Sequence, residues 1–378
     1  MQSILAILRE EPLCFSIKAL SDMIYDAQYH RVSGLVYRLL KKNSSLYPLE
    51  IIEGLKKISS KESEKCLKQF KSLHEIVLAF DKNEIRYLVL KGLLLSHRLY
   101  QDMSVRQSKD IDIFIDINDL TKIDKVLRIA GYHPQKEIQF SKDKIEKLLK
   151  SSNDLIYCKG GIIVEVHYQL DRLNTEFNNF DLYWQQSRKC ELFGYSFSIL
   201  SEQDEWLFLC MHGSKHAWMR LQWLCDVVAL KKQLPKDEVF WQEIRLKARQ
   251  RGIEQHHKLA HQLINKYFES GRSVQKSSLI LSLTEIIMRH HAGSAKKKFR
   301  RYSIVLCHDL LCWFLLPTVA KKFNLILYRP RTFYWPAWVE TRLPSYLYWM
   351  CYLFYFGKIL KMSLKISRDF LWKHLKFD

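Results

Sequence analysis

The sequence has 378 residues, 48% of them hydrophobic, and its 60 Lys and Arg against 40 Asp and Glu give a formal net charge of +20. A chain of this length and composition can bury a sizeable core, which excludes a disordered protein, a collagen-like protein and a small disulfide-stapled protein. With only 12 Gly and 8 Pro, long helices are favoured over a turn-rich all-β fold. The basic charge predicts a polyanionic partner such as a nucleotide, nucleic acid or an anionic membrane surface.

Residues 1–80 predict a helical region. Apolar residues recur three and four positions apart in ILAIL, SGLVYRLL and KSLHEIVLAF. The short apolar run at the N-terminus has no basic residues before it and is followed by Glu10 and Glu11, so a signal peptide is not expected. The nine cysteines are widely spaced and form no C-x-x-C motif, which predicts free thiols in a reducing, cytoplasmic compartment.

Residues 81–200 change to a mixed α/β pattern. EIRYLVLKG is a short strand-like run, LLLSHRLYQ predicts a helix, and KDIDIFIDI alternates strictly as the clearest strand in the chain. Two further strand-like runs, DLIYCK and GIIVEVHYQL, meet at Lys159, Gly160 and Gly161, which predict a hairpin turn. The segment is expected to form one compact α/β unit.

Two aspartates in the clearest strand are the first candidates for catalysis. Asp110 and Asp112 are two positions apart, and because side chains alternate along a strand, both are expected on the same face. Neighbouring carboxylates repel each other unless a cation lies between them, and oxygen ligands suit Mg²⁺. Glu165 interrupts a later apolar strand, with His167 on its face. Three acidic groups on neighbouring strands would form a site in which two metal ions flank a transferring phosphoryl group.

A plainer interpretation of these acidic residues stays open. Asp110 and Asp112 could pair with Lys109 or Arg106, and Glu165 could be a partnered residue of an edge strand. Asp-x-Asp at a strand end is a common pattern and does not by itself indicate catalysis.

Lys91, Gly92 and Arg106 precede the carboxylates in the chain and predict phosphate contacts. Lys91 and Gly92 follow a strand and open a helix, where glycine lets the backbone approach a phosphate and the helix N-terminus favours anions. Arg106 is a further candidate phosphate clamp, with a solvated loop arginine as the alternative.

Residues 201–290 predict a helical domain that begins at a capping box formed by Ser201 and Asp204. His212 and His216 have the H-x-x-x-H spacing of a zinc site, but no acidic residue follows His212 as a metalloprotease helix requires.

The same helical domain carries a basic face. Lys215, His216 and Arg220 are expected to contact the nucleotide or the acceptor, with structural hydrogen bonding as the alternative. Asp226 is expected to pair with Arg220 or His216.

The last segment, 291–378, is both basic and aromatic, with 16 Lys and Arg against 4 Asp and Glu. The run KKKFRRY at 296–302 predicts phosphate binding. From 296 to 372 the segment fits a helical core with snorkelling basic residues, a peripheral contact with an anionic membrane, or single-stranded nucleic acid binding. Its longest uncharged apolar stretch, 343–357, is too short for a confident membrane span.

A series of these motifs resembles a known family. LVLKGLLLSHRLYQDMSVRQSKDIDIFI, a helix ending in AGY, then VEVHYQL and LCMHGSKHAWMRLQWLCDVVAL are similar to the uncharacterised nucleotidyltransferase family of the DNA polymerase β-like superfamily. The resemblance covers roughly residues 85–235. One departure is that Lys91, Gly92 and Leu93 stand where the superfamily more often has Gly-Ser or Gly-Gly.

The resemblance implies a nucleotidyltransferase palm and metal-dependent transfer of a nucleoside monophosphate from an NTP. Lys91 and Gly92 match the family's loop, Asp110 and Asp112 match its metal pair, and Glu165 matches its third carboxylate.

The prediction is therefore an α+β fold with a mixed-sheet palm at 81–200, preceded by the helical region 1–80 and followed by the helical domain 201–290 and the tail 291–378. The predicted enzyme uses Mg²⁺ or Mn²⁺ and an NTP, and its acceptor is a small molecule, sugar, protein or nucleic acid. The alternative is a catalytically inactive scaffold that binds nucleotide, nucleic acid or a membrane surface.

Overall fold

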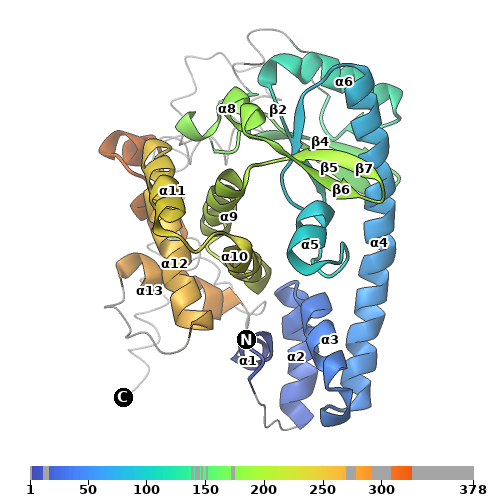
Figure 1. The fold of residues 1–378 in the computed structure, drawn as a ribbon, viewed down its shortest axis with the longest axis vertical. Coiled ribbons are helices and arrows are strands. Elements are labelled where there is room, and N and C mark those ends of the chain that lie inside the picture. The colour runs from blue at the N-terminus through green and yellow to red at the C-terminus, as the bar shows by residue number, and fades with distance from the viewer. Residues whose placement is uncertain are drawn as a thin grey trace, which may run out of the picture.

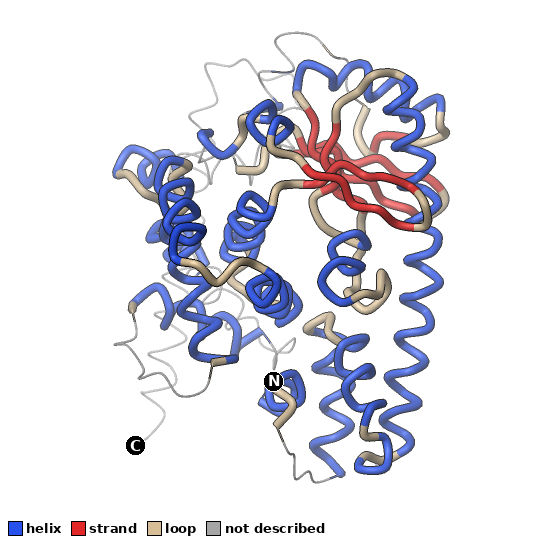
Figure 2. The backbone as a smooth tube through the Cα atoms, viewed as in Figure 1, coloured by secondary structure: helices blue, strands red, loops and turns tan. Residues whose placement is uncertain are grey.

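The structure, a computed structural model, describes residues 2–11, 17–137, 152–171, 175–269, 278–291 and 308–325, together with residues 140, 145, 148 and 149. The described part of the chain contains a seven-stranded mixed sheet and many helices (Figures 1 and 2). The predicted run 296–302 and most of the aromatic tail lie outside the described residues.

The sheet has the strand order β3-β4-β5-β2-β1-β7-β6. β2 pairs in parallel with β5 and antiparallel with β1, and β1 pairs in parallel with β7. The predicted α+β fold with a mixed sheet is confirmed. The strands are β1 (Tyr87–Val89), β2 (Ile111–Ile115), β3 (His133–Pro134), β4 (Asp154–Lys159), β5 (Ile162–His167), β6 (Arg188–Leu192) and β7 (Tyr195–Ile199).

The predicted hairpin joins β4 to β5. Lys159 lies opposite Ile162, and the two residues between them, Gly160 and Gly161, have φ values of 54° and 80°. This is the left-handed conformation that a two-residue hairpin turn requires and that glycine adopts without strain. The turn therefore sets the register of the whole β4–β5 pair.

Helices cover both faces of the sheet (Figure 1). Ile111, Ile113 and Ile115 point to the face covered by α4 and α6, while Phe114 points to the other face and packs near α8 and α9. The helices are α1 (Gln2–Leu8), α2 (Ile17–Tyr29), α3 (Ser33–Lys42), α4 (Leu49–Lys82), α5 (Leu93–Tyr100), α6 (Leu120–Ile129), α8 (Phe180–Gln185), α9 (Glu202–Lys215), α10 (Leu221–Gln233), α11 (Glu238–Gln250), α12 (Glu254–Phe268) and α13 (Leu279–His291).

Helix α4 connects the N-terminal helices to the sheet (Figure 1). Ile51 and Leu55 in its first turns belong to the core formed with α2 and α3. Ile76 and Phe80 in its last turns belong to the core beneath the sheet. The helix thus crosses the predicted boundary at residue 80, whereas the sheet ends at Ile199, close to the predicted boundary at 200.

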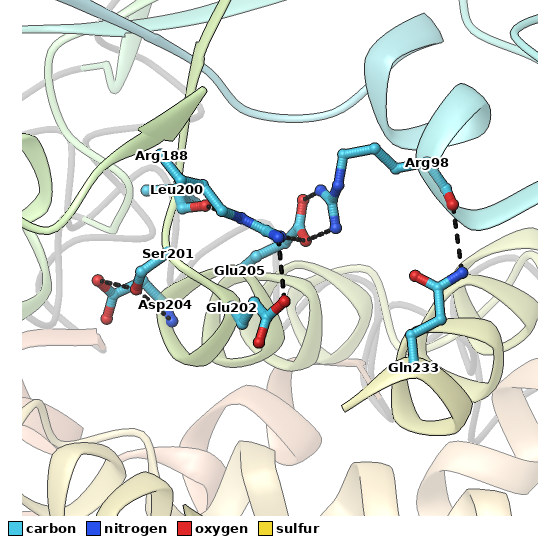
Figure 3. A network of polar contacts seen from close by, with 8 residues as sticks. All are labelled: Arg98, Arg188, Leu200, Ser201, Glu202, Asp204, Glu205 and Gln233. Atoms are coloured by element: carbon cyan, nitrogen blue, oxygen red, sulfur yellow. Dashed lines mark hydrogen bonds and ion pairs between the residues drawn. The ribbon is translucent and has the colours of Figure 1, made fainter. Parts of the chain in front are cut away.

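A charge network centred on the buried Glu205 fastens α9 to α5 and β6 (Figure 3). Arg98 donates two hydrogen bonds to Glu205, and Arg188 donates to both Glu205 and Glu202. Glu205 is 2% exposed, so its charge needs these two arginines. At the start of the same helix the Ser201 hydroxyl accepts from the Asp204 backbone N–H, which confirms the predicted helix start.

The described cysteines, six of the nine, are free. None of the helices that the structure describes has both the length and the apolar character needed to cross a membrane.

The helical domain contains a buried histidine, His257, whose surroundings favour the uncharged form. The Trp206 indole donates to His257 Nδ1 at 3.0 Å, and both residues are buried. Burial and the neighbouring His261 lower the pKa of His257 to about 3. Because this pKa lies below that of an unfolded histidine, the unfolded state takes up the proton first, and stability is lost as the pH falls below about 6.5.

We expect the free energy of unfolding to decrease between pH 7 and pH 5, with a contribution from His257 that approaches about 1.4 kcal/mol per pH unit. His257→Asn keeps an acceptor near the Nδ1 position but cannot titrate, so urea denaturation should show a shallower pH dependence. An unchanged pH dependence in this variant would contradict the assignment.

Candidate active site

Two of the predicted carboxylates lie side by side at the centre of the sheet. Asp112 in β2 is directly opposite Glu165 in the parallel strand β5. The Asp112 side chain is fully buried, and its Oδ1 lies 2.7 Å from Lys91 Nζ and 3.1 Å from His167 Nε2. Its other oxygen, Oδ2, is buried and has no hydrogen-bond partner among the described residues. A buried carboxylate oxygen without a donor is costly, so this atom is suited to hold a ligand.

His167 is the second cation at this carboxylate. Its Nε2 is 3.5 Å from Glu165 Oε2, and its Nδ1 is 3.8 Å from Asp154 Oδ2. Burial lowers the pKa of His167, but the hydrogen bonds to Asp112 and Glu165 outweigh it and raise the pKa to about 9. For Asp112, burial raises the pKa, but Lys91 and His167 hold it well below its ordinary value. At neutral pH the Asp112 carboxylate is ionised and His167 is protonated.

The same side chains fit a divalent cation. One ligand atom from each of Asp112, Glu165 and His167 lies within 4.8 Å of the other two, the single group of this kind among the described residues. Metal binding would require His167 to lose its proton. An imidazole beside two carboxylates suits Mn²⁺ at least as well as Mg²⁺.

Asp110 lies just before β2 and outside this three-ligand group. Burial, together with the charge of Asp112, raises the pKa of Asp110 to about 6, although Lys91 opposes the shift. Its backbone oxygen accepts from the Ser108 hydroxyl at 2.8 Å. Asp110 is thus close enough to Asp112 for the two charges to repel, as two neighbouring carboxylates do.

The turn of Lys91 and Gly92 lies between β1 and α5. Gly92 has φ 76° and ψ −139°, a conformation that side-chain-bearing residues avoid, and it stands directly before the first turn of α5. Burial lowers the pKa of Lys91, but the carboxylates of Asp112 and Asp110 raise it above its ordinary value. In this structure the Lys91 ammonium is directed to Asp112.

Arg106, the predicted phosphate clamp, lies in a buried ion pair. Its Nε donates to Asp226 Oδ2 at 2.8 Å, and the Tyr100 hydroxyl donates to Asp226 Oδ1 at 3.1 Å. The prediction that Asp226 pairs with Arg220 or His216 is wrong. A salt bridge to Arg106 forms instead because α10 packs its buried face against α5 and the loop before β2.

The predicted basic face is broken by a turn. Helix α9 ends at Lys215, and the chain reverses through Ala217 and Trp218, which both have positive φ, before α10 begins. Gly213 permits this reversal, because the ring of Trp218 occupies the space that a Cβ there would need.

The three residues of that face have separate surroundings. His216 stacks on Trp223 with ring centroids 5.0 Å apart, and burial and Lys215 lower its pKa to about 3, so it is neutral. Arg220 donates to the backbone oxygen of Tyr29 and lies over its ring. Lys215 is close enough for its charge to act on Asp154 beside His167.

Two members of the cluster, His167 and Asp154, were not among the predicted site residues. The sequence carries a signal for both. His167 follows Glu165 at the i+2 spacing that keeps it on the same face. If Gly160 and Gly161 are taken as the hairpin turn, counting back along the two strands places Asp154 opposite His167.

Comparison with known proteins gives the family of the chain. A family model described as "Uncharacterised nucleotidyltransferase" matches residues 20–269, well over half of the chain. The chain belongs to this uncharacterised nucleotidyltransferase family. The family named from the sequence motifs is confirmed, and so is the enzyme class, a nucleotidyltransferase.

No curated protein is significantly similar to this nucleotidyltransferase. Two solved structures of the antibiotic-resistance factor ANT(2'')-Ia are similar. The solution structure has 11% sequence identity and a TM-score of 0.37 and covers 52% of this chain and 98% of that one. The crystal structure in complex with adenylyl-2''-tobramycin has 12% identity and a TM-score of 0.29 and covers 53% of this chain and 99% of that one. Since both TM-scores are below 0.5, we draw nothing further from these likenesses.

The Lys91–Asp112 pair gives a test of the cation site in this nucleotidyltransferase. Lys91→Met leaves a buried carboxylate with His167 alone, and removing one partner of a buried pair costs about 3–5 kcal/mol. A bound metal would replace the lost charge, so Mn²⁺ should raise the free energy of unfolding of the variant more than that of the parent protein. Chemical denaturation with and without Mn²⁺ measures both.

Lys109→Met is the matched control, because Lys109 is exposed and adjacent to Asp110. It should change neither the stability nor the response to Mn²⁺ appreciably. An equal Mn²⁺ effect in the parent and in the Lys91 variant would count against a metal site at Asp112.

Proposed function

We propose that this nucleotidyltransferase moves a nucleoside monophosphate from an NTP to a hydroxyl group of its acceptor, with divalent metal ions held by Asp110, Asp112 and Glu165. The observation that carries the proposal is the in-register pairing of Asp112 with Glu165, together with the buried Asp112 Oδ2, which has no hydrogen-bond partner among the described residues. We propose Mg²⁺ or Mn²⁺ as the metal, with His167 as a further ligand. When bound, the metals neutralise phosphate charge and favour ionisation of the acceptor hydroxyl.

The transfer itself is an in-line displacement at the α-phosphorus of the NTP. The acceptor oxygen forms a bond to this phosphorus, the bond to the bridging oxygen of the β-phosphate breaks, and pyrophosphate leaves with the electron pair. Glu165, whose side chain is 25% exposed, accepts the hydroxyl proton. The protein contributes mainly positioning and charge, as in other phosphoryl transfers.

The basic residues around the carboxylates divide into two roles in this proposal. Lys91 leaves Asp112 for the phosphates once the metal is present, and Lys215 contacts the nucleotide or the acceptor from the end of α9. The backbone at Gly92 approaches the phosphates at the start of α5. Arg106, Arg220 and His216 act as positioning residues, because Asp226, Tyr29 and Trp223 hold them.

We further propose that the protein acts in the cytoplasm, which the free cysteines support. Peripheral contact of the basic segment 296–372 with an anionic membrane stays a proposal from the sequence alone.

We expect Asp112→Asn to abolish nucleotidyl transfer, with a loss of at least about a thousandfold, because the variant removes the central charge of the site. The measurement uses each of the four NTPs labelled at the α-phosphate, with cell extract as the source of acceptor, and follows label in the product. Adding EDTA to the parent protein should have the same effect.

Asp116→Asn is the matched control. Asp116 follows the same strand but caps the next turn and pairs with Arg86, away from Glu165. It should lose some stability and keep its transfer activity. Turnover by Asp112→Asn at the rate of the parent protein would contradict the mechanism. Absence of metal-dependent turnover by the parent protein with every NTP would favour the inactive binding scaffold.

A further inference from the structure

The turn between α2 and α3 belongs to the surroundings of the active site. The backbone oxygens of Tyr29 and His30 accept hydrogen bonds from Arg220 and from the Gln222 N–H, which lie at the start of α10. Gln222 in turn donates its side-chain amide to the backbone oxygen of Gln107, three residues before Asp110, at 2.9 Å. The turn, the start of α10 and the loop leading to β2 therefore hold one another in place.

The beginning of α3 contacts the same loop. A Cβ added at Gly34 would lie 2.5 Å from the backbone oxygen of Val105, so α3 approaches the loop as closely as a glycine permits. Contacts on both sides of Arg31, at residues 29–30 and at residue 34, thus fix it beside the segment that carries the carboxylates.

Arg31 is a half-buried cation. Its side chain has no hydrogen bond or ion pair within the part of the chain that the structure describes. The charges that act on it are Asp110 and Glu62, which attract it, and Arg220 and Arg106, which repel it. A partly desolvated guanidinium near two other arginines is unfavourable unless an anion joins them.

Three neighbouring cations are already engaged. Lys91 contacts Asp112, Arg106 contacts Asp226, and Arg220 contacts Tyr29. Arg31 is therefore the guanidinium at this site that can form a two-pronged contact with a phosphate without first losing another partner.

We infer that Arg31 binds the β- and γ-phosphates of the NTP. The inference rests on the proposed function, in which the α-phosphate lies at the carboxylates and the rest of the polyphosphate needs cations beside them. Arg31 reaches this region from the N-terminal helical region, outside the motifs that carry the family resemblance. It holds the leaving pyrophosphate in line rather than taking part in proton transfer.

The backbone at Arg31 allows a clean test. Arg31 has φ 56° and is the second residue after the end of α2. Its N–H bonds to Gln28 O at 3.1 Å, and the N–H of Val32 bonds to Ala27 O at 2.9 Å. This is the helix-ending position that Asn and Gly occupy with least strain. Arg31→Asn should thus keep the turn and lose only the side chain, with a melting temperature equal to or above that of the parent.

The experiment measures binding of Mg²⁺ complexes of the best-bound NTP, and of the corresponding NMP, by calorimetry. We expect Arg31→Asn to weaken NTP binding roughly tenfold or more and to leave NMP binding unchanged, because a charge-assisted phosphate contact is lost. Arg31→Lys should restore part of the NTP affinity. Arg249→Asn, an exposed arginine on α11, is the control and should change neither.

The outcomes separate this inference from the proposed function. Unchanged NTP affinity in Arg31→Asn, or an equal loss of NTP and NMP affinity, overturns the role of Arg31. If Asp112→Asn abolishes transfer in the same preparations, the proposed function stands even where the role of Arg31 fails.

Discussion

The structure around the candidate active site depends on one buried charge, the carboxylate of Asp112. A fully buried carboxylate is stable only beside cations or hydrogen-bond donors, and the fold provides Lys91 from the end of β1 and His167 from β5. Asp112 and His167 lie in the adjacent strands β2 and β5, and Lys91 lies in the turn after β1, the other neighbour of β2, so the strand order β5-β2-β1 is itself a condition for the charge to be buried. In the proposed mechanism, a metal ion and the phosphates of the NTP take over the charge balance that Lys91 and His167 provide here.

The site is enclosed by segments far apart in the chain. The sheet face that carries Asp112 and Glu165 also carries Phe114, which packs on Phe180 and Tyr183 of α8 and belongs to the same core as α9. Arg106 and Asp226 join the loop before β2 to α10, and the turn after α2 meets both. At such a junction, each of the segments that meet can contribute basic side chains to the proposed site.

Long-range contacts also explain where sequence reasoning failed. Asp226 was expected to pair locally, within its own helix or with the preceding turn, and it pairs instead with Arg106, which is 120 positions away. The predicted basic face of Lys215, His216 and Arg220 assumed a continuous helix. The ring of Trp218 packs against Gly213 and reverses the chain between them.

Local sequence patterns were sufficient to predict several other features of the fold and the family. The combined motifs identified the nucleotidyltransferase family. Alternation placed Asp112 on the face of β2 opposite its isoleucines, and the two glycines set the β4–β5 hairpin. These features depend on the chirality and periodicity of the backbone, which act over a few residues and are written directly in the sequence. The pairing of β2 with β5, the partners of the buried arginines and the position of Arg31 depend on which distant surfaces meet. That was decided only by the tertiary structure, because a buried charge is satisfied by whichever partner the packing brings to it.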